Sequence, residues 1–270
     1  MRADVYLVEK GFVPSRNQAQ ELIVRGKVFL IGPDGKKRVV SKPSVKIEFG
    51  AKIHIDQDPE DVKFVSRGGL KMKGALEKVE LDVRGFHALD IGISTGGFTE
   101  CLLQSGASSV VGLDVGHDQL ATKLKKDPRV QLLEGINARD LSQVPLIALN
   151  NGSKYDLCVI DVSFISLTLV LPEAIQYLKE SAPLLALVKP QFEVGREGLG
   201  KNGIVKDALL YRDVEEKIRQ ACGACGMTVE DYFESPIEGS DGNREFFVYA
   251  RPAQLVLGGS ASSRFRASRV

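Results

Sequence analysis

A glycine-rich turn between two apolar runs is the part of this chain best suited to hold a reactive ligand. The turn lies within Ala88-Leu-Asp-Ile-Gly-Ile-Ser-Thr-Gly-Gly-Phe-Thr-Glu100, and a second apolar run, Val110-Val-Gly-Leu-Asp114, ends in an acid. Glycines let a backbone approach a ligand closely, and an acid that closes the next strand about 20 residues later typically accepts hydrogen bonds from ribose hydroxyls. The spacing therefore predicts a pocket for a cofactor that contains a nucleoside.

The residues of the turn indicate which cofactor this is. A dinucleotide fingerprint has the pattern G-x-G-x-x-G, whereas here Ser94 replaces the middle glycine and Asp90 precedes the first one. A carboxylate at that place disfavours a pyrophosphate and favours a cationic group. S-adenosylmethionine, which carries an ammonium and a sulfonium, therefore fits better than NAD. The alternative is a tight strand–helix turn that binds no ligand.

The elements around the turn predict the fold. From Phe86 onward, short apolar runs alternate with helical stretches, which is typical of a parallel sheet with crossover helices. The predicted strands are His87–Asp90, Val110–Asp114, Val130–Leu133, Leu157–Asp161, Leu184–Lys189, Met227–Ser235 and Glu245–Ala250. Only a polar turn separates the last two strands, which is too short for a helical crossover. We expect an α/β, Rossmann-like methyltransferase fold with a mainly parallel seven-stranded sheet and an antiparallel last strand.

Four charged residues stand at the ends of these elements. Asp161 and Lys189 each close an apolar run, Glu245 begins the last strand, and Lys71 lies on a helix that begins near Gly69. Ligands of open parallel sheets bind outside the carboxyl ends of the strands, so we expect these side chains on one rim. Each also has a purely structural alternative, as a helix cap or as a solvated strand end.

The first 58 residues differ from the rest in charge. They hold eleven Lys/Arg against seven Asp/Glu, while the remainder holds 25 against 28. A short helical stretch, Asp4–Lys10, precedes a helix over Arg16–Val24 that Ser15 should cap, and strands follow through Ile55. A basic module beside a nearly neutral domain suggests an anionic polymer as partner, and a merely solvated surface is the alternative.

The order of elements in this module resembles the alpha-L RNA-binding domain, the type first seen in a ribosomal small-subunit protein. The resemblance rests on Ser15-Arg16-Asn-Gln-Ala-Gln-Glu-Leu-Ile-Val-Arg25-Gly26-Lys27-Val28, Ser41-Lys-Pro-Ser-Val and Phe49-Gly-Ala-Lys-Ile53. It implies that Arg16, Arg25 and Lys27 line a surface that reads the shape and phosphates of structured RNA. We assign Arg67, which follows the module, to the same RNA-binding role.

Five motifs along the chain closely resemble those of the TlyA-type ribosomal RNA methyltransferases, which carry an FtsJ-like methyltransferase domain behind such a module. They are Ser66-Arg-Gly-Gly-Leu-Lys71, the glycine-rich turn, Val159-Ile-Asp161-Val-Ser-Phe, Val188-Lys189-Pro-Gln-Phe-Glu and Gly242-Asn-Arg-Glu245-Phe. The resemblance implies a catalytic set of Lys71, Asp161, Lys189 and Glu245. It implies methyl transfer from S-adenosylmethionine to a ribose 2′-hydroxyl, on cytidines of ribosomal RNA, with ribosomal RNA or ribosomal subunits as partners and no membrane.

The residue types of the catalytic set suit this chemistry. A ribose hydroxyl is a poor nucleophile at neutral pH and must lose its proton as it attacks the methyl group. Lys189 would serve either as the base or as the group that orients the hydroxyl, and a base role requires a neutral amine, which desolvation or the charge of Lys71 would favour. Asp161 and Glu245 would position the lysines and the hydroxyl.

We predict that the cofactor contacts are Asp90, Gly92, Ser94, Gly97, Phe98, Asp114, Asn137 and Asp161. The two glycines and Ser94 would form the turn against the methionine moiety, and Phe98 would begin the helix. Asp114 would hold the ribose hydroxyls. Asn137 would lie beside the adenine, or it is a plain turn asparagine.

Length and composition fit two domains. We predict an RNA-binding domain at 1–58, a linker at 59–65, a methyltransferase domain at 66–252 and a disordered tail at 253–270. No apolar run approaches the ~18 residues of a membrane helix, and the N-terminus lacks an apolar signal region, so we expect a cytoplasmic protein.

Other motifs and function classes are weaker. Cys222-Gly-Ala-Cys225 has no second pair to complete a metal site, so we expect no metal. Gly195-Arg-Glu-Gly-Leu-Gly200-Lys201 begins like a phosphate-binding loop, but Asn202 replaces the required Ser or Thr. Two alternatives stay open: an RNA-binding or ribosome-assembly protein without catalysis, and a haemolysin, a label that relatives often carry.

Overall fold

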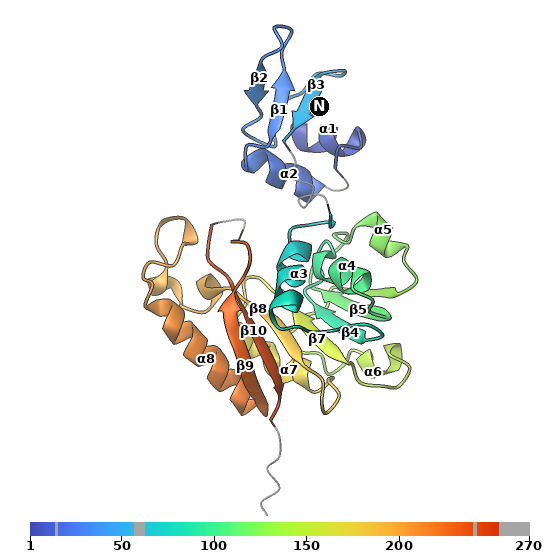
Figure 1. Ribbon diagram of the computed structural model, residues 1–270, viewed down its shortest axis with the longest axis vertical. Helices are drawn as coiled ribbons and strands as arrows, with labels where there is room; N and C mark the ends of the chain where they lie inside the picture. Colours follow the sequence, from blue (N-terminus) through green and yellow to red (C-terminus); the bar gives the residue numbers. More distant parts are fainter. Residues whose placement is uncertain (14–15, 57–62, 240–241, 254–270) are drawn as a thin grey trace, which may run out of the picture.

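The structure is a computed structural model, and it describes residues 1–13, 16–56, 63–239 and 242–253 (Figure 1). The predicted cap at Ser15, most of the predicted linker at 59–65 and residues 254–270 of the predicted disordered tail lie outside the described residues. The first residue of that tail, Ala253, donates a backbone hydrogen bond to Gly226.

The N-terminal module is a small α+β unit with its own core. Helices α1 (Ala3–Glu9) and α2 (Arg16–Val24) pack against a sheet of order β2-β1-β3, formed by β1 (Val28–Ile31), β2 (Lys37–Val39) and β3 (Lys52–Ile55). Both outer strands are antiparallel to β1. The core contains Leu7, Leu22, Ile23, Val28 and Ile47, all 2% exposed or less. The helix predicted for Arg16–Val24 is confirmed.

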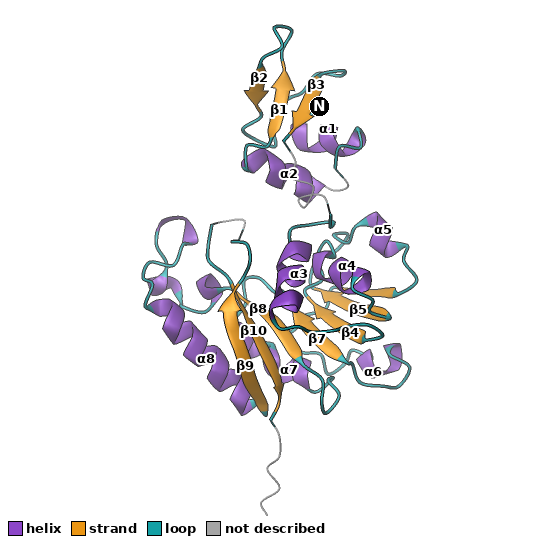
Figure 2. Cartoon of the chain, viewed as in Figure 1, coloured by secondary structure: helices purple, strands orange, loops and turns teal. Residues whose placement is uncertain are grey.

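The C-terminal domain is built on a seven-stranded sheet of order β6-β5-β4-β7-β8-β10-β9 (Figure 2). Its strands are β4 (His87–Ile91), β5 (Ser109–Asp114), β6 (Val130–Glu134), β7 (Leu157–Ile160), β8 (Leu184–Val188), β9 (Met227–Glu234) and β10 (Phe246–Pro252). Strands β4 to β8 pair in parallel, and β10 is antiparallel to both of its neighbours. The predicted fold class is confirmed.

Helices cover both faces of this sheet (Figure 2). Alternate residues of each central strand point to opposite faces, as the period of two requires: Cys158 and Ile160 of β7 join one core, whereas Leu157 and Val159 join the other. One face is covered by α3 (Gly68–Lys78), α4 (Gly97–Gln104) and α5 (Thr122–Lys125), and the other by α6 (Leu146–Leu149), α7 (Leu171–Ile175) and α8 (Leu210–Ala224).

Short 3-10 turns follow β7 and β8, namely η2 (Leu167–Leu169), η3 (Pro190–Phe192), η4 (Arg196–Gly198) and η5 (Lys201–Gly203). Strands β7 and β8 each end one residue earlier than predicted, at Ile160 and Val188, and β10 starts one residue later, at Phe246. Asp161, Lys189 and Glu245 therefore lie at the strand ends, where the backbone N–H of Asp161 still donates to Ile91 and the carbonyl of Glu245 accepts from Ser235. Within the described segments, no helix has both the length and the apolar character needed to cross a membrane.

Candidate active site

Two pockets adjoin at the carboxyl ends of the parallel strands, and Gly92, Ser94 and Asp161 line both of them. The larger, of about 550 Å³, extends over the ends of β4, β5 and β6. The smaller, of about 200 Å³, lies between the glycine-rich turn and the start of α3. This is the edge of an open α/β sheet where ligands bind.

The glycine-rich turn brings backbone close to backbone. Gly92 has φ +87°, and a Cβ there would collide with the carbonyl oxygen of Asp161. A Cβ on Gly97 would collide with Ser66 and with the backbone of Gly69, so this glycine lets α4 pack against the start of α3. Both glycines line the smaller pocket. Their absence of a side chain serves internal packing as well as access for a ligand.

Phe98 forms part of the wall of the smaller pocket. It follows Gly97 in the first turn of α4, is 4% exposed and lies 6.0 Å from the ring of Phe247 on β10. Stacked aromatic rings of this kind stiffen a wall.

Both carboxylate oxygens of Asp114 are fixed by hydrogen bonds from backbone N–H groups. Oδ2 accepts a hydrogen bond from the backbone N–H of Ser94 at 2.8 Å, and Oδ1 accepts one from Gly116 at 2.7 Å. Each carboxylate oxygen has a second lone pair, so the group can still accept hydrogen bonds from two hydroxyls. Ser94 reaches Asp114 through a backbone with φ +46°, which costs about 1 kcal/mol for a non-glycine residue. These remaining acceptor positions fit the hydroxyls of a ribose.

The rest of the larger pocket offers apolar surface for a flat base. Val115, Ile136 and Ala138 line it, and Val115 is 69% exposed. Asn137 lines the same pocket, and its Oδ1 accepts a hydrogen bond from the backbone N–H of Arg139 at 3.0 Å. The turn role and the pocket position that the sequence offered as alternatives for Asn137 therefore coexist, with the side-chain NH₂ left as a donor.

Lys189 and Asp161 form an ion pair beside the junction of the two pockets. Lys189 Nζ lies 2.6 Å from Asp161 Oδ1 and donates a hydrogen bond to Ser163 Oγ at 2.8 Å. The side chains of Lys189 and Asp161 are only 12% and 24% exposed. An ammonium has three donors, so one N–H of Lys189 remains for a ligand.

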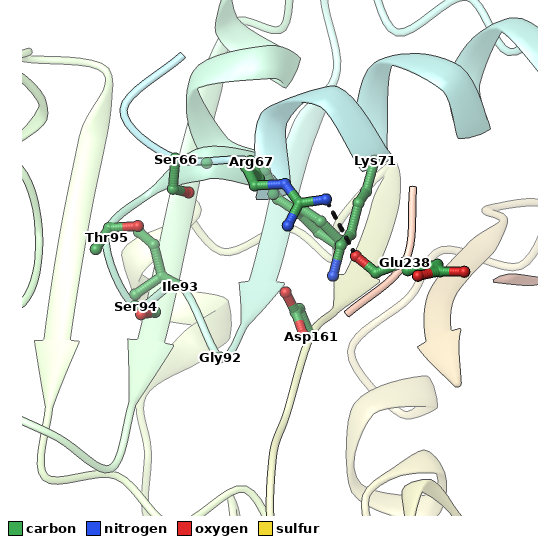
Figure 3. A pocket seen from close by; sticks show the side chains of 12 residues that line it. Ser66, Arg67, Lys71, Gly92, Ile93, Ser94, Thr95, Asp161 and Glu238 are labelled. Atoms are coloured by element: carbon green, nitrogen blue, oxygen red, sulfur yellow. Dashed lines mark hydrogen bonds between the residues drawn. The ribbon is translucent and has the colours of Figure 1, made fainter. Parts of the chain in front are cut away.

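Lys71 and Glu245 form a second, more deeply buried ion pair. Lys71 Nζ on α3 donates to Glu245 Oε2 at the start of β10, and the two side chains are 11% and 4% exposed. Figure 3 shows the side chains of Lys71 and Asp161 directed into the same space. Lys71 and Asp161 line the smaller pocket, and Glu245 contacts Lys71. The four residues of the predicted catalytic set thus come together as two ion pairs on one rim.

Asp90 lies behind the pocket and lines neither part of it. Its side chain is fully buried on the face of β4 that α4 covers, and its Oδ2 accepts a hydrogen bond from Thr99 at 2.6 Å. Burial raises the pKa of Asp90 to about 7, and the nearby Asp161 and Asp114 add to the rise. A cofactor contact by Asp90 stays a prediction, because the side chain has no surface exposed to the pocket.

The raised pKa of Asp90 predicts how stability depends on pH. A carboxyl whose pKa is higher in the folded state binds more protons there, so the protein loses stability as the pH rises from about 4 to 7. Asp90→Asn removes this titration. We expect the free energy of unfolding of this variant, relative to that of the wild type, to rise by about 2–3 kcal/mol between pH 5 and pH 8, measured by chemical denaturation.

Asp82→Asn is the matched control for this experiment. Arg84 holds the pKa of Asp82 at about 2, so Asp82 is ionised in both states throughout that pH range. Its substitution should shift stability by the same amount at pH 5 and pH 8. A pH-independent difference for Asp90→Asn as well would contradict the assignment.

The residues predicted to bind RNA are divided between the domains. Arg16 Nη2 donates to the buried Asp4 at 3.1 Å, and this carboxylate also accepts from Arg2 and Gln20. The neighbouring guanidinium groups hold the pKa of Asp4 well below its usual range.

Arg25 is exposed at the end of α2, and Lys27 Nζ lies 3.7 Å from Asp56. Arg67 is different, because it lines the smaller pocket and donates to the carbonyl of Glu238 (Figure 3). The structure thus brings Arg67 to the catalytic site, apart from the other three.

Sequence reasoning missed Ser163 and Phe164. Ser163 accepts the hydrogen bond from Lys189, and Phe164 is 92% exposed, lines the larger pocket and lies 5.2 Å from the ring of Phe192. Phe164 has φ +64°, a left-handed conformation that is rare for a bulky residue and typical of functional sites. Both residues belong to the motif Val159-Ile-Asp161-Val-Ser-Phe, two and three positions after Asp161, and this was the only sequence signal for them.

Comparison with known proteins agrees with this geometry. Residues 64–252 match the family described as FtsJ-like methyltransferase, and residues 1–30 match the S4 domain. The chain is 41% identical over 250 residues to the 16S/23S rRNA (cytidine-2′-O)-methyltransferase TlyA of Mycobacterium tuberculosis, covering 93% of this chain and 89% of the relative.

Two further relatives carry a different label. Hemolysin A of Brachyspira hyodysenteriae is 37% identical over 249 residues, which cover 92% of this chain and 99% of the relative. A solved structure described as a hemolysin from Streptococcus thermophilus superposes with a TM-score of 0.72 at 37% identity, covering 94% of this chain and 89% of that one. The chain therefore belongs to the TlyA family of FtsJ-like methyltransferases with an N-terminal S4 domain.

Proposed function

We propose that this protein transfers a methyl group from S-adenosylmethionine to the 2′-hydroxyl of a cytidine in ribosomal RNA. The observation that carries the proposal is the Lys189–Asp161 ion pair at the junction of the two pockets, with the Lys71–Glu245 pair beside it. A cofactor in one part of the site and a ribose near the lysines would then meet at these charged groups.

The residues around the larger pocket fit the adenosine part of the cofactor. Asp114 has two oxygens fixed by backbone N–H groups and can accept from both ribose hydroxyls, while Val115 and Ile136 offer apolar surface to the base. The smaller pocket beside Gly92 and Gly97 would hold the methionine part. The bound cofactor supplies a methyl group on a positively charged sulfur.

Lys189 would act on the attacking hydroxyl. When the oxygen–carbon bond forms and the carbon–sulfur bond breaks, the hydroxyl proton must leave. Lys189 would take it as a neutral amine, the form that desolvation and the positive charge of Lys71 favour. Otherwise Lys189 orients the hydroxyl as a donor, and the proton leaves to water. Both routes need Nζ where Asp161 and Ser163 hold it.

Lys71 and Glu245 would hold each other in place at the rim as a buried ion pair. Each is buried, so each requires the other as its partner. The ammonium of Lys71 faces the same space as Asp161 and would stabilise the negative charge that develops on the attacking oxygen.

The S4 module and Phe164 would deliver the nucleotide. The module supplies basic side chains for the phosphates of structured RNA, and the exposed ring of Phe164 offers a surface on which an unpaired base can stack. An rRNA substrate would place the protein in the cytoplasm.

Methyl transfer to purified ribosomal RNA tests the proposal directly. The protein is incubated with radiolabelled S-adenosylmethionine and either ribosomal subunits or naked ribosomal RNA. Label should appear in RNA at a cytidine whose 3′ phosphodiester resists alkaline hydrolysis, because that cleavage requires a free 2′-hydroxyl. Label on a base, or no label with any ribosomal substrate, would contradict the proposal.

The role of Asp114 in cofactor binding leads to a quantitative prediction. Asp114→Ala should weaken S-adenosylmethionine binding by about 1.5–3 kcal/mol, the value of hydrogen bonds to a charged group, in isothermal calorimetry. Asp118→Ala is the control, because Asp118 lies four residues away with a side chain that is 91% exposed. Wild-type protein should show no saturable binding of NADH. Equal affinities for both variants would remove Asp114 from the cofactor site.

A further inference from the structure

Two segments that carry site residues are joined at three places. One segment follows β7 and contains Asp161, Ser163 and Phe164, and the other follows β8 and contains Lys189 and Phe192. The first junction is the contact of Lys189 with Asp161 and Ser163, and the second is the ring contact of Phe164 with Phe192. The third lies away from the pockets.

This third junction is centred on Glu193. Its side chain is 1% exposed, and both oxygens are engaged. Oε1 accepts from the backbone N–H of Leu167 at 2.6 Å, and Oε2 accepts from Ser166 Oγ at 2.6 Å. Glu193 lies four residues after Lys189, and Ser166 and Leu167 lie five and six residues after Asp161. The side chain of Glu193 therefore joins the two segments by hydrogen bonds.

Lys217 of α8 supplies the charge that makes this burial tolerable. Its Nζ donates to Glu193 Oε2 at 2.8 Å and to the backbone oxygen of Glu193 at 3.0 Å. A buried carboxylate without a cation or hydrogen bonds would be strongly destabilising, so the position is retained only with this full set of partners. We call Glu193, Ser166, Leu167 and Lys217 the Glu193 anchor.

We infer that Glu193 is a positioning residue for methyl transfer, which sets Lys189 against Asp161 and Ser163 through the Glu193 anchor. The inference rests on the proposed function. Glu193 touches neither pocket, so it acts only through the two segments that it joins. The chain between Glu193 and Lys189 is the single turn η3, which is too short to absorb a shift of one end without moving the other. A displacement of about 1 Å in a reacting geometry can lower a rate about 100-fold.

Glu193→Gln tests the anchor with little change of shape. The amide has one acceptor and one donor end, whereas Leu167 N–H and Lys217 Nζ are both donors. Either orientation of the amide therefore sets a donor against a donor. Adding Lys217→Met removes one of them, and the amide can then accept from Leu167 and donate to Ser166. We expect the single variant to lower the single-turnover rate about 10- to 100-fold and the double variant to recover most of the loss.

A second measurement does not depend on methyl transfer. The chain has no tryptophan, so Phe192→Trp introduces a single fluorescent reporter at a half-buried position, in the ring contact with Phe164 that joins the two segments. In this background, Glu193→Gln should increase the accessibility of the indole to acrylamide, and the double variant should restore it. This readout decides the structural part of the inference even if the protein methylated no RNA.

Lys179→Met is the matched control. Lys179 is 43% exposed and lies 2.6 Å from Asp156 at the opposite end of the sheet, while Lys217 is 42% exposed. The control should change neither the rate nor the quenching. The inference is overturned if Glu193→Gln retains the wild-type rate, if the rate falls without a change in quenching, if the double variant shows no recovery, or if Lys179→Met produces the same losses.

Discussion

Lys189→Ala should lower the single-turnover rate of methyl transfer by roughly 100- to 10,000-fold, the contribution typical of a positioned acid–base group. Lys189 is held by Asp161 at 2.6 Å and by Ser163 at 2.8 Å, with one N–H directed to neither. The affinities for S-adenosylmethionine and RNA should stay nearly unchanged, because Lys189 acts mainly in the transition state. Rates at saturating cofactor and RNA, with separate binding measurements, check both statements.

Lys189→Arg should not restore the rate. A guanidinium stays protonated at any accessible pH, and its flat fork does not match the two contacts that fix Nζ. Lys154→Ala is the control, because Lys154 is an exposed lysine close to the amino-terminal end of β7. Near-normal rates for Lys189→Ala would return this lysine to the role of a solvated strand end.

Removal of residues 1–58 should reduce methylation of ribosomal RNA about 100-fold or more at limiting RNA, while the sheet domain stays folded and binds S-adenosylmethionine. The two cores are separate: the module is closed around residues such as Leu7 and Ile23, and the catalytic domain packs its own residues on both faces of its sheet. Loss of a linked binding module removes an effective concentration that is typically worth 100-fold or more.

The salt dependence of RNA binding separates this effect from misfolding. The plot of log affinity against log salt should be steep for the intact protein and clearly shallower for the truncated one, because fewer phosphates are neutralised. Arg25→Gln, a single exposed position on the module, should lower the slope by about one. Full activity of the truncated protein, or an unchanged slope, would exclude the module as the source of RNA affinity.

The alternation of short apolar runs with helical stretches, and the short polar turn between the last two runs, predicted the strands of the catalytic domain. The same local pattern placed Asp161, Lys189 and Glu245 at strand ends, because a polar residue that interrupts an apolar run marks where the sheet stops. The S4 module and the catalytic set were predicted from short motifs, and within each motif the residues are close together in the sequence. The predictions for Ser15 and for most of the linker and the tail concern positions that the structure does not describe.

The pairing of the charged residues depended on the tertiary structure. Lys71 and Glu245 are 174 positions apart in the sequence. They meet only because β10 inserts beside β8 in the sheet and α3 covers one face of that sheet. Strand order and register are long-range properties, and local periodicity does not encode them.

The same reason explains what the sequence did not reveal about individual residues. Asp90 was expected beside a cation, but its place on β4 turns it under α4, where burial raises its pKa. Gly92 and Gly97 were expected to admit a ligand, and each also admits another segment of the chain. Glu193 lay inside a recognised motif without a role, because its partners come from two other elements. The sequence by itself determined which chemistry this chain carries, and only the packing of distant segments decided which side chains face one another, since burial and hydrogen bonding are set by neighbours that local patterns do not specify.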